Sequence, residues 1–188
     1  MHLVIGLSGA SGLIYGIRLL EVLQKEPGVE THLVMTGSAK MNIAIETDWQ
    51  VDDVKAMADH VYSVKDISAR IASGSFKTDG MIVAPCSIKT LSAIVNSYGD
   101  NLLVRAADVV LKERRKLVLV PRETPLHTGH CRLFYEASQM GVILAPPVPA
   151  FYTRPKTIDD LVNHHVGRLL DLFDMDVGLV TRWQGTTE

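Results

Sequence analysis

Four polar side chains that could bind a phosphate each follow an apolar stretch of this sequence. Three are hydroxyls, at Ser11, Thr36 and Ser87, and the fourth is the guanidinium of Arg122. If the apolar stretches are neighbouring parallel strands, their carboxyl ends meet at one edge of a sheet, and these side chains gather there. We therefore expect an anion site at that edge. The alternative for Ser11 and Ser87 is that each only caps the first turn of a helix.

A glycine-rich turn near the amino terminus limits which nucleotide such a site could take. Gly6, Gly9 and Gly12 follow or interrupt the first apolar run, and their spacing is not that of the G-x-G-x-x-G dinucleotide fingerprint. The second predicted strand ends in Thr36-Gly37-Ser38, without the acid that would bind a ribose diol. Because hydroxyls and the amide groups of a helix start suit a phosphate, the pattern favours a mononucleotide such as FMN over NAD.

The loop after the apolar stretch 117–120 carries an arginine next to a glutamate. Arg122 and Glu123 stand between two prolines, which restrict the loop. An arginine at this place can hold a phosphate with two parallel hydrogen bonds, and a carboxyl group beside a phosphate is a candidate proton donor. Lys112 closes the preceding helix with other basic residues, where a cation also complements the helix dipole without any ligand.

Histidine clusters and two cysteines could suggest a metal or a nucleophile, but the patterns are incomplete. His127-Thr128-Gly129-His130-Cys131 and His164-His165 lack an obvious carboxylate ligand, so no metal is expected. The turn Gly9-Ala10-Ser11-Gly12 is not the G-x-S-x-G elbow of a hydrolase. Cys86 and Cys131 form no C-x-x-C pair and are expected as free thiols.

The elements that must position these residues alternate between strand and helix. After the first strand, turn and helix, the predicted strands cover 31–35, 80–84, 117–120 and 142–145. The predicted helices cover about 38–46, 48–60, 88–98, 101–115, 128–140 and 158–173, and 63–79 is expected to be a surface excursion that could be mobile. This alternation predicts an α/β fold of three layers, Rossmann-like and flavodoxin-like, in which a mostly parallel sheet has helices on both faces.

Length and charge restrict the class of protein further. The chain has 188 residues, 47% of them hydrophobic, which fits one domain with a full core. A net charge of −2 gives no general attraction to nucleic acid or to an anionic membrane. Because no apolar run approaches the ~20 residues of a membrane span and no leader pattern precedes the first strand, we expect a cytoplasmic protein. We expect a single flavoprotein domain over 1–188, with a tail at about 174–188 that packs on a neighbouring subunit.

A set of short motifs, in this order, resembles the UbiX/Pad-type flavin prenyltransferases, whose older name is aromatic acid decarboxylase. They are Gly9-Ala10-Ser11-Gly12, Glu46-Thr47-Asp48, Pro85-Cys86-Ser87-Ile88-Lys89-Thr90, Arg105-Ala106-Ala107-Asp108, Leu111-Lys112-Glu113-Arg114-Arg115, Pro121-Arg122-Glu123-Thr124-Pro125 and Pro149-Ala150-Phe151-Tyr152. The resemblance implies that the protein joins the dimethylallyl group of dimethylallyl phosphate to N5 and C6 of reduced FMN, without a metal. It also implies a homo-oligomer, a dodecamer, whose product, prenylated FMN, serves a separate UbiD-type decarboxylase.

The resemblance also implies roles for individual residues. Those that would hold FMN are Gly9, Ala10, Ser11, Thr36, Ser38, Ser87, Ile88, Lys89, Thr90 and Arg122. Those that would surround the prenyl phosphate are Arg105, Lys112, Glu123, Tyr152 and Arg168, with Trp183 covering the site. Ser11 and Glu46 would move protons at the flavin. This arrangement fits the chemistry, because breaking an allylic C–O bond places positive charge on the prenyl unit and negative charge on the phosphate.

Two other functions stay open on the sequence. One is an FMN-binding carrier or decarboxylase subunit that acts on aromatic or phenolic acids. The other is oxidative decarboxylation of a cysteine-containing peptide, as flavin-containing cysteine decarboxylases of similar fold perform. Those enzymes carry a Pro-x-Met-Asn-x-x-Met-Trp stretch, whereas the corresponding loop here is Pro121-Arg122-Glu123-Thr124-Pro125.

Overall fold

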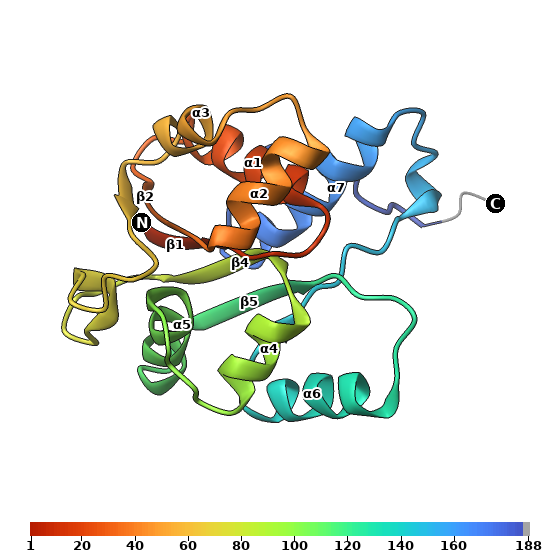
Figure 1. Ribbon diagram of the computed structural model, residues 1–188. Coiled ribbons are helices and arrows are strands. Elements are labelled where there is room, and N and C mark those ends of the chain that lie inside the picture. Colours follow the sequence, from red (N-terminus) through yellow and green to blue (C-terminus); the bar gives the residue numbers. More distant parts are fainter. Residues whose placement is uncertain (186–188) are drawn as a thin grey trace.

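Six parallel strands form the central sheet in the computed structural model, which describes residues 1–185 (Figure 1). Along the chain they are β1 (His2–Leu7), β2 (Glu30–Met35), β3 (His60–Tyr62), β4 (Gly80–Cys86), β5 (Lys116–Pro121) and β6 (Ile143–Leu144). Across the sheet their order is β3-β2-β1-β4-β5-β6, so the chain builds outward from β1 and then returns to add β4 on its other side. In doubly wound sheets ligands bind at the carboxyl ends of the strands beside such a reversal.

Helices cover both faces of this sheet, as the sequence predicts (Figure 1). One face carries α1 (Leu13–Leu23), α2 (Gly37–Glu46), α3 (Val51–Ala56) and α7 (Ile158–Asp171), and the other carries α4 (Ile88–Val95), α5 (Leu102–Lys112) and α6 (Thr128–Gln139). Short 3-10 helices, η1 (Arg70–Ala72) and η2 (Phe151–Thr153), lie in the connections. The three-layer α/β prediction is therefore confirmed. None of the described helices is long and apolar enough to cross a bilayer.

The strands β1, β4 and β5 are apolar over most of their length because both of their faces are buried. In β1, Leu3 and Ile5 pack with α1 and α7, whereas Val4 packs with α5 on the opposite side, and all three are at most 1% exposed. A strand with two buried faces shows no alternation of polar and apolar residues. For this reason each of these strands appears in the sequence as a short apolar run.

The stretch 48–60 differs from its predicted structure. Its helical spacing predicts one helix, but only Val51–Ala56 is helical, and His60 begins β3. Residues 60–62 pair in parallel with 32–34 of β2, which satisfies their backbone groups in the sheet. The prediction was wrong at this end because pairing with a distant strand overrides local helical spacing.

The segment 63–79 runs over the surface, and arginine side chains of the neighbouring element fasten it. Arg115 donates hydrogen bonds to the carbonyls of Phe76 at 3.0 Å and Gly74 at 2.8 Å. The backbone N–H of Leu102 donates to the carbonyl of Val64 at 2.8 Å, at the start of α5. The segment 63–79 is thus held at both ends of α5. The contact at the start of α5 lies near the carboxyl edge of the sheet, and the Arg115 contacts after its end lie near the amino edge.

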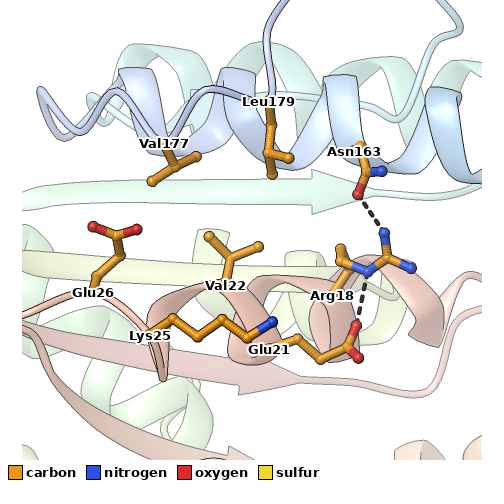
Figure 2. A pocket seen from close by; sticks show the side chains of 8 residues that line it. All are labelled: Arg18, Glu21, Val22, Lys25, Glu26, Asn163, Val177 and Leu179. Carbon is orange, nitrogen blue, oxygen red and sulfur yellow. Dashed lines mark hydrogen bonds and ion pairs between the residues drawn. The ribbon is translucent and has the colours of Figure 1, made fainter.

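The C-terminal segment after α7 returns along α1 of the same chain. An open hollow of about 410 Å³ lies between them. Figure 2 shows Val177 and Leu179 on one side of it and Val22 on the other. Arg18 of α1 donates to Asn163 of α7 and pairs with Glu21 at 2.7 Å. Val177 and Leu179 pack against the core, and Arg182 pairs with Asp171 of α7 at 2.9 Å. The tail is therefore held against its own chain at least as far as residue 182, and its packing on a neighbouring subunit stays a prediction.

The same helix pair gives the protein a pH-dependent stability. His165 of α7 packs edge to face on Tyr15 of α1, with ring centroids 5.2 Å apart, and burial lowers the pKa of His165 to about 4. In the unfolded chain the His165 imidazole is protonated below about pH 6.5, whereas in the folded chain its pKa is about 4. Between these two pH values the unfolded state binds more protons, so the free energy of unfolding falls as the pH falls. Between pH 7 and pH 4 the free energy of unfolding should therefore fall by about 2 kcal/mol less in His165→Leu than in the wild type.

Urea unfolding of the wild type and of His165→Leu at pH 7 and pH 4 measures this difference. Burial also lowers the pKa of His32 to about 4, so the variant should keep part of the wild-type slope. An unchanged slope in His165→Leu would contradict the assignment.

Candidate functional site

A cleft of about 490 Å³ opens at the carboxyl ends of β1, β2 and β4. Its walls come from the loops that follow these strands, from the start of α5 and from the loop after β5. The lining residues are Gly9, Thr36, Gly37, Ser38, Val64, Ser87, Ile88, Lys89, Thr90, Asn101 and Glu123. The structure thus gathers most of the residues expected to hold FMN, which the sequence distributes over more than a hundred positions.

Two helices direct their N-termini at this cleft. Thr36 caps α2 by accepting from the N–H of Ala39 at 3.1 Å, and Ser87 caps α4 by accepting from the N–H of Thr90 at 3.2 Å. The hydroxyls are therefore helix caps, which was the alternative weighed for Ser87, and they also line the cleft. The remaining free amide groups of the first turns and the positive helix ends make this wall attractive to an anion.

The third helix start, that of α1, is already occupied by a carboxylate. Glu46, at the end of α2, accepts hydrogen bonds from the N–H groups of Gly12 at 2.7 Å and Leu13 at 3.2 Å. Ser11 is exposed beside this contact. Because Glu46 already neutralises this helix end, a phosphate in the cleft would bind at α2 and α4 instead. Ser11 and Glu46 are close in space, as the resemblance implies.

Ser8 is a residue of the site region that the sequence analysis did not single out. It is fully buried at the end of β1, where its hydroxyl donates to the carbonyl of Pro85 at 3.0 Å and accepts from the N–H of Ser87 at 2.7 Å. One side chain therefore joins the loops after β1 and β4, on the two sides of the topological reversal. A hydroxyl directly after an apolar strand was the available signal.

Gly9 is required by the close approach of the loop after β1 to the first turn of α2. A Cβ placed at Gly9 would overlap the Cβ of Ser38, so an alanine there must push this loop and this turn apart. We expect Gly9→Ala to weaken FMN binding by at least about tenfold, because the cleft wall must shift. Flavin titration measures this effect.

Gly99→Ala is the matched control for this prediction. A Cβ at Gly99 meets nothing within 4 Å, and the residue does not line the cleft. Gly99→Ala should therefore bind FMN like the wild type. Equal FMN affinity in Gly9→Ala and the wild type would contradict the prediction, because the contact between residues 9 and 38 could then widen without changing the cleft.

The loop that carries Arg122 and Glu123 closes the cleft on the side of β5. The N–H of Arg122 donates to the carbonyl of Cys86 at 3.3 Å, which fixes the start of this loop against β4. Both side chains are exposed, and Glu123 lines the cleft. Burial raises the pKa of the Cys86 thiol, so this sulfur at the base of the loop stays protonated and is not a nucleophile.

A second group of expected residues lies on η2, α7 and the C-terminal segment. The rings of Tyr152 and Trp183 meet edge to face at 5.8 Å, although these side chains are 50% and 62% exposed. The Tyr152 hydroxyl lies 3.3 Å from Nε2 of His164, one helical turn before Arg168. Arg168 pairs with Asp171 at 2.6 Å. Tyr152 and Trp183 are thus in contact, and Arg168 follows one turn after the histidine beside Tyr152, but none of the three lines the cleft, so their place around a prenyl phosphate stays a prediction.

Lys112 and Arg105 also lie outside the set of residues that line the cleft of their own chain. Asn101, just before α5, lines the cleft, whereas Lys112 ends this helix, about 16 Å further along its axis. There Lys112 pairs with Glu113 at 2.5 Å and lies beside Gly74. Arg105 donates to the carbonyl of Ala72 at 3.2 Å. Within one chain Lys112 cannot share a ligand with Glu123.

Comparison with known proteins first places the chain in a class. The model of the Flavoprotein family matches residues 1–167, which include all six strands and every residue that lines the cleft. The chain is therefore a flavoprotein by family.

More similar proteins define the family within this class. The Flavin prenyltransferase UbiX of Thauera aromatica is 61% identical over 188 residues, which are 100% of this chain and 96% of that protein. A dodecameric FMN-dependent UbiX-like decarboxylase from Escherichia coli O157:H7 superposes with a TM-score of 0.97 at 53% identity, covering 98% of this chain and 100% of that one. AnUbiX (PadA1) in complex with FMN and dimethylallyl pyrophosphate gives a TM-score of 0.96 at 49% identity, over 99% and 98% of the two chains. This chain belongs to the UbiX family of flavin prenyltransferases, which confirms the resemblance noted in the sequence.

Proposed function

We propose that this protein transfers the dimethylallyl group of dimethylallyl phosphate to N5 and C6 of reduced FMN, in the cytoplasm and without a metal. The product, prenylated FMN, would serve a UbiD-type decarboxylase. The observation that carries the proposal is the cleft at the carboxyl edge, in a chain whose whole length matches flavin prenyltransferases.

The residues of the cleft fit FMN. Its phosphate would lie at the N-termini of α2 and α4, where Thr36 and Ser87 hold the first turns in place. Arg122 could complete the phosphate site with a bidentate contact. Gly9 lies close to Ser38 and has no side chain that would enter the space for the flavin. The remaining expected FMN contacts are Ala10, Ser11, Ile88, Lys89 and Thr90.

The chain's own residues would assist the loss of the allylic phosphate. When bound, reduced FMN supplies the nucleophile. Glu123 would donate a proton to the departing phosphate, and Arg168 would balance its negative charge. The faces of Tyr152 and Trp183 would lie against the prenyl unit, since aromatic faces attract positive charge. Ser11 and Glu46 would hold or move a proton at the flavin edge.

A complete site would need a second copy of the chain. Lys112 and Arg105 stand too far from the cleft of their own chain, so a neighbouring subunit would bring them to the phosphate. This arrangement agrees with an oligomer, and the relative from Escherichia coli O157:H7 is dodecameric. Exposure of Tyr152 and Trp183 in the single chain supports an interface over this group.

Anaerobic incubation of the purified protein with reduced FMN and dimethylallyl phosphate tests the function. Mass spectrometry of the released flavin should show the gain of one C5 prenyl unit, together with free phosphate. Bound but unmodified FMN with intact dimethylallyl phosphate would instead favour a flavin carrier or a decarboxylase subunit, and loss of CO2 from added aromatic acids would separate those two.

A further inference from the structure

Three histidines surround one glutamate at the amino edge of the sheet, the edge opposite the flavin cleft. His2 begins β1, Glu30 and His32 are in β2, and His60 begins β3. The register places His2 opposite Glu30 and His32 opposite His60, so all four side chains lie on one face of three neighbouring strands. The flavin site uses none of them.

The nitrogens of these histidines converge on a single carboxylate oxygen. Oε1 of Glu30 lies 3.4 Å from Nδ1 of His2, 3.3 Å from Nε2 of His32 and 2.9 Å from Nε2 of His60. Two ligand atoms of a tetrahedral zinc ion, each about 2.0–2.1 Å from the metal, stand about 3.3–3.4 Å apart. The first two distances have this value. The ligand atoms of His2, Glu30 and His32 all lie within 4.8 Å of one another.

The hydrogen bonds of the cluster leave these two nitrogens available. His32 is fully buried, and its Nδ1 lies 3.0 Å from the hydroxyl of Tyr62, so Nε2 faces Glu30. Nε2 of His32 and Nδ1 of His2 are both buried and have no hydrogen-bond partner among the described residues. A buried polar atom without a partner costs free energy, and a metal ion would satisfy both. The contact with Tyr62 is the outer hydrogen bond that usually orients a metal-binding imidazole.

We propose that His2, Glu30 and His32 bind a divalent transition metal ion, of which Zn²⁺ is the best match to this set of ligands. Two imidazole nitrogens and one carboxylate oxygen suit Zn²⁺ better than Mg²⁺ or Ca²⁺, which prefer oxygen ligands. His60 donates to Glu30 and is a positioning residue. The side chains of His2 and Glu30 are 44% and 37% exposed, so the ion can enter from solvent and water can complete its coordination. The ion would join β1 to β2 at the edge remote from the flavin.

Zinc titration of the untagged, chelator-treated full chain tests this site. Calorimetry should give one Zn²⁺ per chain, and the unfolding temperature should rise with added Zn²⁺ because only the folded chain assembles the ligands. His2→Gln and Glu30→Gln should each weaken binding by at least ~10-fold and abolish the thermal shift. His2 is partly exposed, so its replacement leaves the core intact.

His130→Gln is the matched control. His130 lies near a second histidine, with ring centroids 3.7 Å apart, but this pair belongs to no three-ligand group in the described residues. The control should bind Zn²⁺ like the wild type, and all variants should bind FMN equally. Absence of saturable Zn²⁺ binding by the wild type would overturn the proposal, as would wild-type Zn²⁺ affinity in His2→Gln and Glu30→Gln. Neither result would affect the prenyltransferase proposal, because its test measures product formation at the cleft on the opposite edge of the sheet.

Discussion

Glu123→Gln is expected to slow flavin prenylation by about 10²-fold or more, while FMN affinity changes by less than about twofold. Glu123 lines the cleft with an exposed carboxyl group, beside the arginine expected to hold phosphate. Glutamine keeps the size and the hydrogen-bonding ability of the side chain, but it cannot give up a proton. The rate loss therefore reports proton transfer to the leaving group rather than a damaged cleft.

Single-turnover prenylation followed by mass spectrometry, with a parallel FMN titration, measures both quantities. Glu136→Gln is the control, because Glu136 pairs with Arg132 on the surface of α6, away from the cleft. It should prenylate at the wild-type rate. A Glu123→Gln protein as fast as this control would exclude a proton role for Glu123.

Mixed oligomers of two inactive variants should recover activity. Lys112→Ala and Glu123→Gln are each expected to slow prenylation by about 10²-fold or more when purified alone. If each site takes Glu123 from one chain and Lys112 from another, random mixing in equal amounts restores both residues in about a quarter of the sites. The physical reason is the length of α5, which separates Lys112 from the cleft of its own chain.

Co-expression of the two variants with different tags, followed by two-step purification, gives the mixed oligomer. The matched control mixes Glu123→Gln with Arg122→Ala. These neighbouring residues belong to one loop of one chain, so every site in that mixture lacks one of them and no activity should return. An inactive mixture of Lys112→Ala and Glu123→Gln would mean that both residues act from the same chain, against the distance along α5.

The fold and most of the cleft could be predicted from the sequence because both depend on local signals. Apolar runs followed by glycine and hydroxyl residues define strand, turn and helix, and parallel strands bring those turns to one edge. Thr36, Ser38 and Ser87 were found in this way, whereas the assignment of residues 88–90 to FMN came from the family resemblance. Glu46 came only from the family resemblance, because its contact with Gly12 joins two helices that the sequence does not place together.

Other features depend on contacts between distant parts of the chain. Strand β3 exists only because β2 offers it a parallel partner, so helical spacing misled the prediction there. The cluster at the amino edge has the same origin, since residues at 2, 30, 32 and 60 become neighbours only through strand register. The separation of Lys112 from Glu123 likewise follows from the direction of α5 relative to the sheet.

The buried hydroxyl of Ser8 has a consequence for the kinetics of flavin capture. It links the loop after β1 to the loop after β4 through two hydrogen bonds, and it is inaccessible to water. These loops therefore move together, and the entropy of ordering them is lost when the chain folds rather than when the ligand arrives. Flavin association should show no slow isomerisation at this wall. We expect any adjustment on binding in the exposed side chains of the loop around Arg122.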